Sequence, residues 1–165
     1  MKLKIIFTLL VVFALAAVAS AQTKMSGTAQ SSKPDQEYTI QVRDRPNHSF
    51  VISQAKCTWT KPWEIAGIQN KEGVGTTFAE IRGNTSRTLE YCVQTMANGD
   101  KAYLREEGTI TLKDGVPQSV DVKWTFVGGT GKLKGVKGKG TCKLREVAAD
   151  GSMTGDCEGE YELPK

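Results

Sequence analysis

The chain has 165 residues, with 22 Lys and Arg against 18 Asp and Glu and a formal net charge of +4 at pH 7. This length allows one ordinary domain and excludes two large ones. So weak an excess of cations does not by itself predict a polyanionic partner.

Residues 1–21 have the pattern of a secretory signal peptide. Two lysines precede an apolar run from Ile5 to Val18, and Ala19-Ser20-Ala21 then supplies a small-x-small cleavage site. The run is shorter than the roughly 20 residues needed to span a bilayer. We therefore expect cleavage after Ala21, a secreted or periplasmic protein, and no transmembrane segment in the mature chain.

Removal of residues 1–21 leaves 144 residues with a net charge of +2, because two of the 22 cations lie in the removed segment. Residues 22–36 contain Met25 and Ala29 as their only apolar side chains and are rich in Ser, Thr, Gln and Lys. Such a segment buries too little apolar surface to offset its ordering entropy, so we expect a disordered leader. Residues 37–165 then form the single folded domain.

From Tyr38 onward, short segments alternate between apolar and polar residues, which is typical of strands. The segment Lys61–Asn70 has a spacing closer to helical and predicts a short helical turn. Asn98-Gly99 and Asp114-Gly115 are two-residue hairpin signals. Before the last hairpin, we expect strands over residues 38–42, 49–60, 76–82, 88–96, 102–112 and 116–127.

With the last hairpin, the pattern gives about eight short strands without a crossover helix. It predicts an all-β fold, a small antiparallel up-and-down β-barrel with a short helical turn. A closed barrel is preferred to an open sheet because closure removes the exposed edges.

The last hairpin starts from the lysine- and glycine-rich segment Gly128–Arg145, whose spacing fits neither a Walker-type phosphate loop nor a dinucleotide fingerprint. Folding the chain back at Ala149-Asp150 pairs positions whose numbers sum to 299. A turn centred on Asp150-Gly151 would shift the register by two and separate the cysteines. We prefer the first register, a structural ladder of opposite charges, to a polyanion site. In it, Lys137 faces Glu162, Lys139 faces Glu160, Lys143 faces Asp156, Cys142 faces Cys157, and Gly138 faces Tyr161.

Four cysteines in an exported chain make disulfides the expected state. Three pairings of Cys57, Cys92, Cys142 and Cys157 are possible. The hairpin register favours Cys142 with Cys157, which leaves Cys57 with Cys92. The spacings show no close ligand pair, and His48 is the single histidine, so we expect no metal site.

Residues 128–138 read GGTGKLKGVKG. They resemble the GGTG-x-(aromatic)-x-G-x-x-G hairpin motif of the allene oxide cyclase and dirigent-like barrels and of their bacterial exported relatives of unknown function, with Leu133 in the aromatic place. The resemblance implies a small eight-stranded antiparallel barrel. Those plant families guide oxylipin cyclisation or phenoxy-radical coupling with polar residues from other strands, and none of those residues can be placed in this sequence.

No catalytic set is recognisable. His48 lies in a turn and reads as a surface or turn histidine, and Glu106 and Glu107 are strand neighbours that point to opposite faces. We expect an exported non-enzymatic barrel, either structural or binding a small apolar molecule, without a cofactor or a nucleic-acid partner. The alternatives are an isomerase or coupling enzyme of the resembled kind and a polyanion-binding secreted protein. The oligomeric state stays open. A ligand cavity would be lined by Trp59, Tyr91, Tyr103, Trp124 and Phe126, and Trp63 is a further aromatic candidate.

Overall fold

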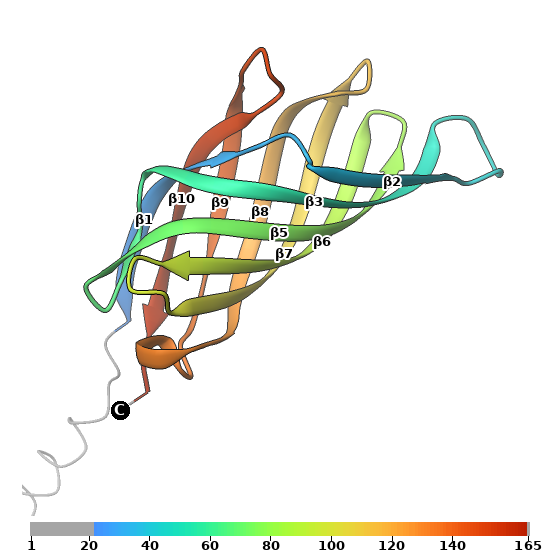
Figure 1. Cartoon of the computed structure of the whole chain (residues 1–165). Helices are drawn as coiled ribbons and strands as arrows, with labels where there is room; N and C mark the ends of the chain where they lie inside the picture. Colours follow the sequence, from blue (N-terminus) through green and yellow to red (C-terminus); the bar gives the residue numbers. More distant parts are fainter. Residues whose placement is uncertain (1–21, 165) are drawn as a thin grey trace, which may run out of the picture.

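The structure is a computed structural model that describes residues 22–164, so the expected signal peptide lies outside the described residues. The chain forms a closed antiparallel barrel of eight strands with two further short strands (Figure 1). In the described part, no helix is long and apolar enough to cross a membrane. The strands are β1 (Thr23–Ser31), β2 (Gln36–Gln41), β3 (His48–Lys61), β4 (Glu64–Ile65), β5 (Ile68–Arg82), β6 (Thr85–Met96), β7 (Lys101–Lys113), β8 (Val116–Gly129), β9 (Lys137–Val147) and β10 (Met153–Glu162).

The barrel closes through strands that are distant in sequence. Strands β5 to β10 pair with their sequence neighbours, β1 lies between β10 and β3, and β3 pairs with β5. Every pairing is antiparallel. The expected all-β barrel is therefore confirmed. In Figure 1 the turn between β9 and β10 lies at the top, which we call the upper end, and the short 3-10 helix Gly131–Leu133 lies at the lower end.

Strand β1 corrects the expectation of a disordered leader over residues 22–36. Its Met25, Gly27 and Ala29 point inward and are buried. A Cβ at Gly27 would lie only 2.7 Å from the Lys61 carbonyl oxygen, so the backbones pack closely there. The strand is held by backbone ladders on both sides rather than by large apolar side chains, and composition does not reveal such ladders.

The connection between β3 and β5 corrects the expected helical turn. Residues 64–69 form a tight hairpin in which Ile65 pairs with Ile68. Ala66 and Gly67 both have positive φ, 54° and 75°, as a two-residue hairpin turn requires. The apolar spacing that resembled a helix instead arises because this hairpin folds into the barrel.

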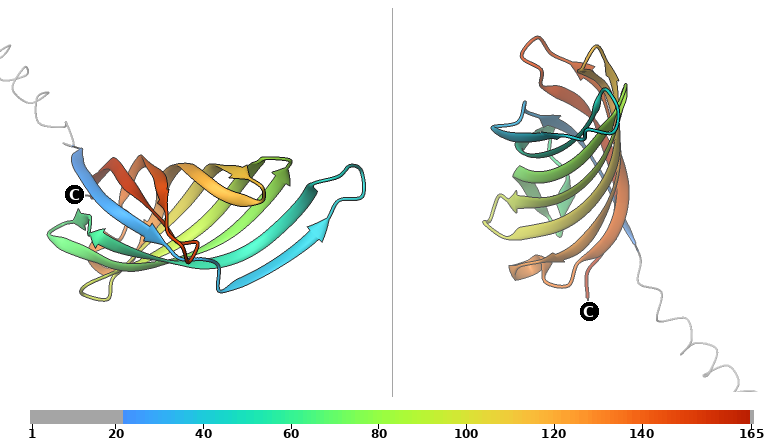
Figure 2. Two further views of the ribbon diagram at one scale, coloured as in Figure 1. Left: turned by 90° about the horizontal axis from the view of Figure 1, so that it is seen from above. Right: turned by 90° about the vertical axis from the view of Figure 1, so that its right-hand side faces the viewer.

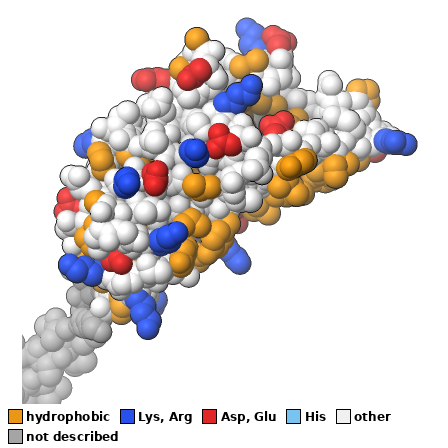
Figure 3. All heavy atoms as spheres, viewed as in Figure 1, with side chains coloured by type: hydrophobic (Ala, Val, Ile, Leu, Met, Phe, Trp, Pro, Cys, Tyr) orange, Lys and Arg blue, Asp and Glu red, His pale blue; other side chains and the backbone are white. Residues whose placement is uncertain are grey.

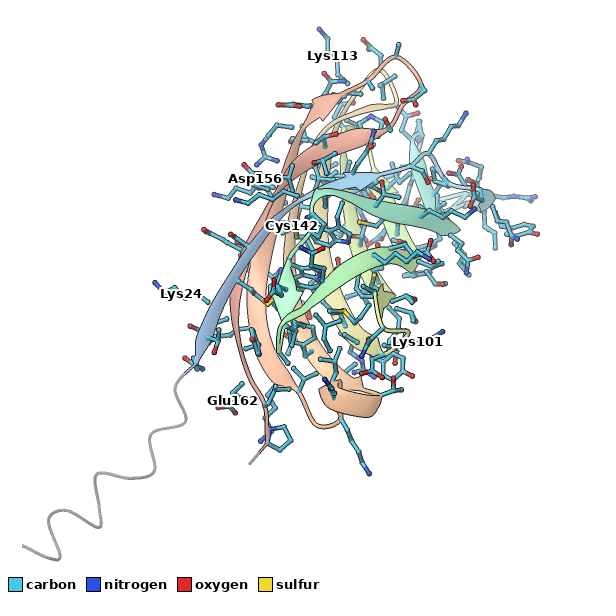
Figure 4. The ribbon with its side chains drawn as sticks, turned by 60° about the vertical axis from the view of Figure 1, so that its left-hand side comes forward. Lys24, Lys101, Lys113, Cys142, Asp156 and Glu162 are labelled. Atoms are coloured by element: carbon cyan, nitrogen blue, oxygen red, sulfur yellow. A yellow bond between two sulfur atoms is a disulfide. The ribbon has the colours of Figure 1, made fainter. Side chains whose placement is uncertain are left out.

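The predicted register of the last hairpin is confirmed at every predicted pair within the two strands. Lys137, Lys139 and Lys143 lie opposite Glu162, Glu160 and Asp156, and Gly138 lies opposite Tyr161. Cys142 and Cys157 form a disulfide with their Cα atoms 4.0 Å apart. Figure 4 shows Lys24 and Asp156 pointing away from the barrel, whereas Cys142 lies on its inner side.

The expected disulfide between Cys57 and Cys92 is not formed, and both residues are free thiols. Strand β5 separates the two cysteines, because Cys57 pairs with Gly73 of β5 and Cys92 pairs with Gly75. Two strand spacings amount to about 10 Å, which exceeds the Cα separation that a disulfide spans.

The lower half of the barrel is filled by one apolar cluster. The β3–β5 connection inserts Trp63 and Ile65, which are 2% and 0% exposed. Trp63 packs edge-on against Trp124 and stacks on Phe126. The cluster also contains Met25, Cys92, Met96, Ala102, Leu104, Leu133, Val136 and Tyr161.

The β2–β3 hairpin extends the sheet beyond the closed part of the barrel (Figure 2). A row of apolar residues crosses the outer face there, because Tyr38, Ile52, Phe78 and Leu89 are successive cross-strand partners. All four are exposed. Figure 3 shows hydrophobic side chains gathered along the lower right edge of the molecule.

Candidate functional site

The barrel interior contains a compact group of acids and thiols. Glu90 of β6 and Glu106 of β7 are direct cross-strand partners. Both share the inward face of the sheet with the buried Cys92 and Leu104. The ligand atoms of Glu90, Cys92 and Glu106 all lie within 4.8 Å of one another. We call these three residues, together with Cys57 of β3, the acid–thiol cluster.

The cluster has no positive counter-charge. Among residues 22–164, no basic side chain forms an ion pair with Glu90 or Glu106. Burial, and then the charge of Glu90, raise the pKa of Glu106 to about 8. Burial also raises the pKa of Glu90, although a 2.7 Å hydrogen bond donated by the Thr77 hydroxyl opposes this. The pair therefore retains a proton at neutral pH.

The two thiols are also affected by this environment. Burial, followed by the charges of Glu106 and Glu90, raises the pKa of Cys57 to about 12. The same causes in the same order raise the pKa of Cys92 well above that of a free thiol. Both cysteines are therefore protonated at neutral pH, and neither has the lowered pKa of a nucleophilic cysteine.

Gln94 holds Cys92 in place through a fixed amide orientation. The Gln94 Oε1 accepts hydrogen bonds from Asn70 Nδ2 at 2.8 Å and from Trp59 Nε1 at 3.3 Å. Because the indole N–H can only donate, Oε1 must face Trp59. The Gln94 Nε2 then points to the Cys92 sulfur at 3.2 Å.

Glycines on β5 make room for these side chains. A Cβ at Gly75 would overlap the Glu90 carboxylate, and a Cβ at Gly73 would lie 2.6 Å from the Gln94 amide. Glu90 and Gln94 therefore lie across the bare backbone of β5, in the direction of β3. Cys57 faces Gly73 from that side.

Beside and above the cluster, several inward-facing side chains are small. Ser53, Ala55, Thr77, Thr88 and Gly108 occupy inward positions of β3, β5, β6 and β7, and all five are partly exposed. By contrast, every member of the lower cluster is at most 9% exposed. These five positions are thus more open to solvent than the lower cluster, whereas Val51 and Ala79, further along β3 and β5, are buried.

The residues proposed to line a cavity divide between the two faces of the sheet. Trp124 and Phe126 lie inside the barrel in the lower cluster, and Trp59 packs against it by stacking on Trp63. Tyr91 and Tyr103 stack on each other on the outer face, where Tyr91 is 44% exposed. The structure therefore brings three of the five residues together and places two of them outside.

Sequence reasoning missed the Glu90–Glu106 pair. The exclusion of Glu106 with Glu107 holds, because these neighbours point to opposite faces, but the cross-strand partner depends on the turn. Residues 97–99 form a three-residue loop, in which the Met96 N–H donates to the Asp100 carbonyl at 2.8 Å. A two-residue turn at Asn98-Gly99 would have paired Glu90 with Glu107. A G1-bulge turn is the signal that could have revealed the pair.

His48 differs from the expected surface histidine. It is 5% exposed, and its ring nitrogens lie 2.7 Å from Asp44 Oδ1 and 2.9 Å from Glu80 Oε1. The hydrogen bond with His48 is the largest cause that lowers the pKa of both carboxyls. His48 therefore ties the loop after β2 to β5, on the outer face and away from the acid–thiol cluster.

The comparisons with known proteins give a fold but no activity. No protein-family model matches the chain, and no curated protein matches it. The solved structures that are similar include two described as pterocarpan synthase dirigent proteins. PsPTS1 is 14% identical with a TM-score of 0.53, covering 88% of this chain and 97% of its own. GePTS1 is 12% identical with a TM-score of 0.51, covering 88% and 92%. The fold is therefore a barrel of the dirigent type.

Proposed function

We propose that this protein is an exported, non-catalytic barrel that binds one small, mainly apolar molecule in the upper half of its interior. The supporting observation is a contrast within the interior. Aromatic and aliphatic side chains fill the lower half, whereas Ser53, Ala55, Thr77 and Gly108 give one part of the inward face above it small, partly exposed side chains. Binding sites of this kind are concave and largely apolar, with a few polar groups.

Export is supported by the Cys142–Cys157 disulfide, since disulfides persist in oxidising compartments. It is also supported by the signal-peptide pattern of residues 1–21. The synthase activity in the names of the similar structures belongs to those proteins.

Binding is tested by titrating the purified protein with fluorescent fatty acids and with phenolic probes while Trp fluorescence is followed. We expect a saturable response of one probe per chain. Ala55→Leu enlarges an inward side chain and should remove the response, whereas Phe78→Ser on the outer face should leave it unchanged. Native mass spectrometry of protein purified from its own host should show a retained small molecule.

The apolar probe could instead bind to a groove on the outer face of the barrel. A groove there is lined by Phe78, Leu89, Glu107, Lys123 and Thr141, among others. If Phe78→Ser removes the response and Ala55→Leu does not, the probe occupies this outer groove and the interior site is wrong. A wild-type protein without any saturable response would contradict the binding function itself.

A further inference from the structure

The acid–thiol cluster brings carboxylates and thiols, two kinds of metal-ligating side chain, together inside the barrel. Glu90, Cys92 and Glu106 face one another in the barrel, with Cys57 across β5, and a half-buried carboxylate pair without a cation is unfavourable. We propose that Glu90, Cys92, Glu106 and Cys57 form a binding site for one thiophilic divalent metal ion of the zinc class. This inference does not depend on the binding of an apolar molecule.

The donor types select the class of metal. Calcium and magnesium take oxygen ligands, usually six or more, and a thiol is a poor ligand for either. Zinc and metals like it accept thiolate and carboxylate together, typically from four ligands in a tetrahedron. Glu90, Cys92 and Glu106 already bring their ligand atoms within 4.8 Å of one another, which suits a single ion.

Cys57 supplies the fourth donor from the other side of β5. Gly73 and Gly75 have no side chains, so nothing on β5 stands between Cys57 and the ligands on β6. Glu90 already lies across Gly75 toward β3. The same geometry that prevents a Cys57–Cys92 disulfide therefore leaves both thiols free to share an ion.

The surroundings of Cys92 fit a metal-bound thiolate. Cys92 is 2% exposed, and the amide N–H of Gln94 is directed at its sulfur because Trp59 and Asn70 fix the amide oxygen. A donor aimed at sulfur stabilises the thiolate form, as the supporting hydrogen bonds of metal ligands do. Gln94 is thus a positioning residue for the site.

Charge balance also favours an ion. Every titratable group that faces the cluster, Glu90 and Cys92 of β6, Glu106 of β7 and Cys57 of β3, is acidic, and no basic partner from the packed strands is present among the described residues. Because a metal ion binds cysteine as the thiolate, binding of a divalent cation must release thiol protons into the solvent.

The experiment uses the mature protein, freed of metal with a chelator and kept without reductant so that the Cys142–Cys157 disulfide stays intact. Co²⁺ is titrated in and the thiolate-to-cobalt charge-transfer absorption is recorded, and Zn²⁺ affinity follows from displacement of Co²⁺. We expect one ion per chain, a thiolate band, and proton release in calorimetry performed in two buffers.

Four variants define the site. Cys92→Ser and Glu106→Gln should abolish the band, and Cys57→Ser should weaken it because one thiolate is lost. Gln94→Leu should lower Zn²⁺ affinity by about 10 to 100-fold. Glu107→Gln is the matched control, since this neighbour of Glu106 points outward, and it should change nothing. Near-UV circular dichroism establishes that each variant is folded, and Glu106→Gln is expected to fold because it only neutralises a buried acid.

Several results would overturn the proposal. These are the absence of a thiolate band in the wild type, metal binding that survives both Cys92→Ser and Glu106→Gln, and a Cys57–Cys92 disulfide in the purified protein. A Cys57→Ser variant with unchanged spectrum and affinity would overturn the assignment of the fourth donor. The apolar-probe titration is a separate measurement, so failure of one site leaves the other testable.

Discussion

Glu90 and Glu106 face each other across β6 and β7 inside the barrel, and neither has a cationic partner in the part of the chain that the structure describes. Burial raises the pKa of Glu106 to about 8, while an unfolded glutamate titrates near pH 4.5. Between these two values the unfolded chain releases its proton and the folded protein keeps it. The stability that Glu106 contributes is therefore full below about pH 4.5 and is lost as the pH rises toward 8.

In metal-free protein, Glu106→Gln should remove most of this pH dependence and stabilise the fold at pH 8, by roughly 2 kcal/mol. Urea unfolding at pH 5 and pH 8 measures the effect. Glu107→Gln, at the next position and pointing outward, should leave the pH dependence as it is. If the free energy of unfolding changes equally between pH 5 and pH 8 in the wild type and in Glu106→Gln, Glu106 ionises normally.

The disulfide pairing predicts a specific thiol count. Without reduction, each molecule should have two free thiols, and peptide mapping should give Cys142 linked to Cys157. Replacing both by alanine opens a 15-residue loop and should cost about 3 kcal/mol in the chain-entropy description. Cys57→Ser should leave the linked peptide intact. Recovery of a Cys57–Cys92 peptide would refute the pairing in the structure.

Trp124 packs onto two glycines that face each other on β9 and β10. A Cβ at Gly140 would overlap the Trp124 ring and the Glu158 carbonyl oxygen, and a Cβ at Gly159 would also overlap the ring. Gly140→Ala should therefore destabilise by about 1 to 3 kcal/mol, through overpacking. Thr141→Ala on the other face should change the free energy of unfolding by less than about 0.5 kcal/mol. Equal effects of the two in urea unfolding would show that the ring does not rest on Gly140.

The charge ladder on the outer face continues from β9 and β10 to β1. Glu160 lies between Lys139 and Lys24, which are its partners on the two sides. Glu160→Lys would place three lysines side by side, so it should cost about 0.5 to 1 kcal/mol and create heparin binding at physiological salt. Glu64→Lys makes the same charge change elsewhere and should not. Tight heparin retention by the wild type would favour the polyanion-binding alternative.

Sequence predicts the fold best where a single strand-pairing register places several residues opposite suitable partners. In the last hairpin, the cysteines and three lysine–acid pairs agree on a single register, and a shift by two positions would separate the cysteines although it would still place lysines opposite acids. Strand β1 offers no such signal, since its inward residues are Met25, Gly27 and Ala29 and its stability comes from backbone pairing on both sides.

The acid–thiol cluster could not be predicted for a different reason. It depends on whether the turn after β6 contains two or three residues, because a change of one residue exchanges Glu106 and Glu107 between the two faces. Tyr91 and Tyr103 are predicted inside the barrel because they are aromatic. The alternation of side chains along β6 and β7 instead places both on the outer face, where they stack on each other. Cys57, the fourth proposed donor, lies on β3, and only the side-chain-free glycines of β5 separate it from the ligands on β6. This arrangement can be recognised only when the pairing of β3, β5 and β6 is known.

The pairing of β1 with β10 determines when this protein can fold. The Thr28 hydroxyl donates to Asp156, 128 positions later in the chain, and the ring of strands is incomplete until both partners are available. During synthesis, β3 and β5 to β9 therefore form an open sheet with unpaired edges until β10 is available. Contacts so distant in sequence slow folding, and waiting edges expose the chain to aggregation. We expect chaperones to matter more for the yield of this barrel than for a protein whose neighbouring strands close it early.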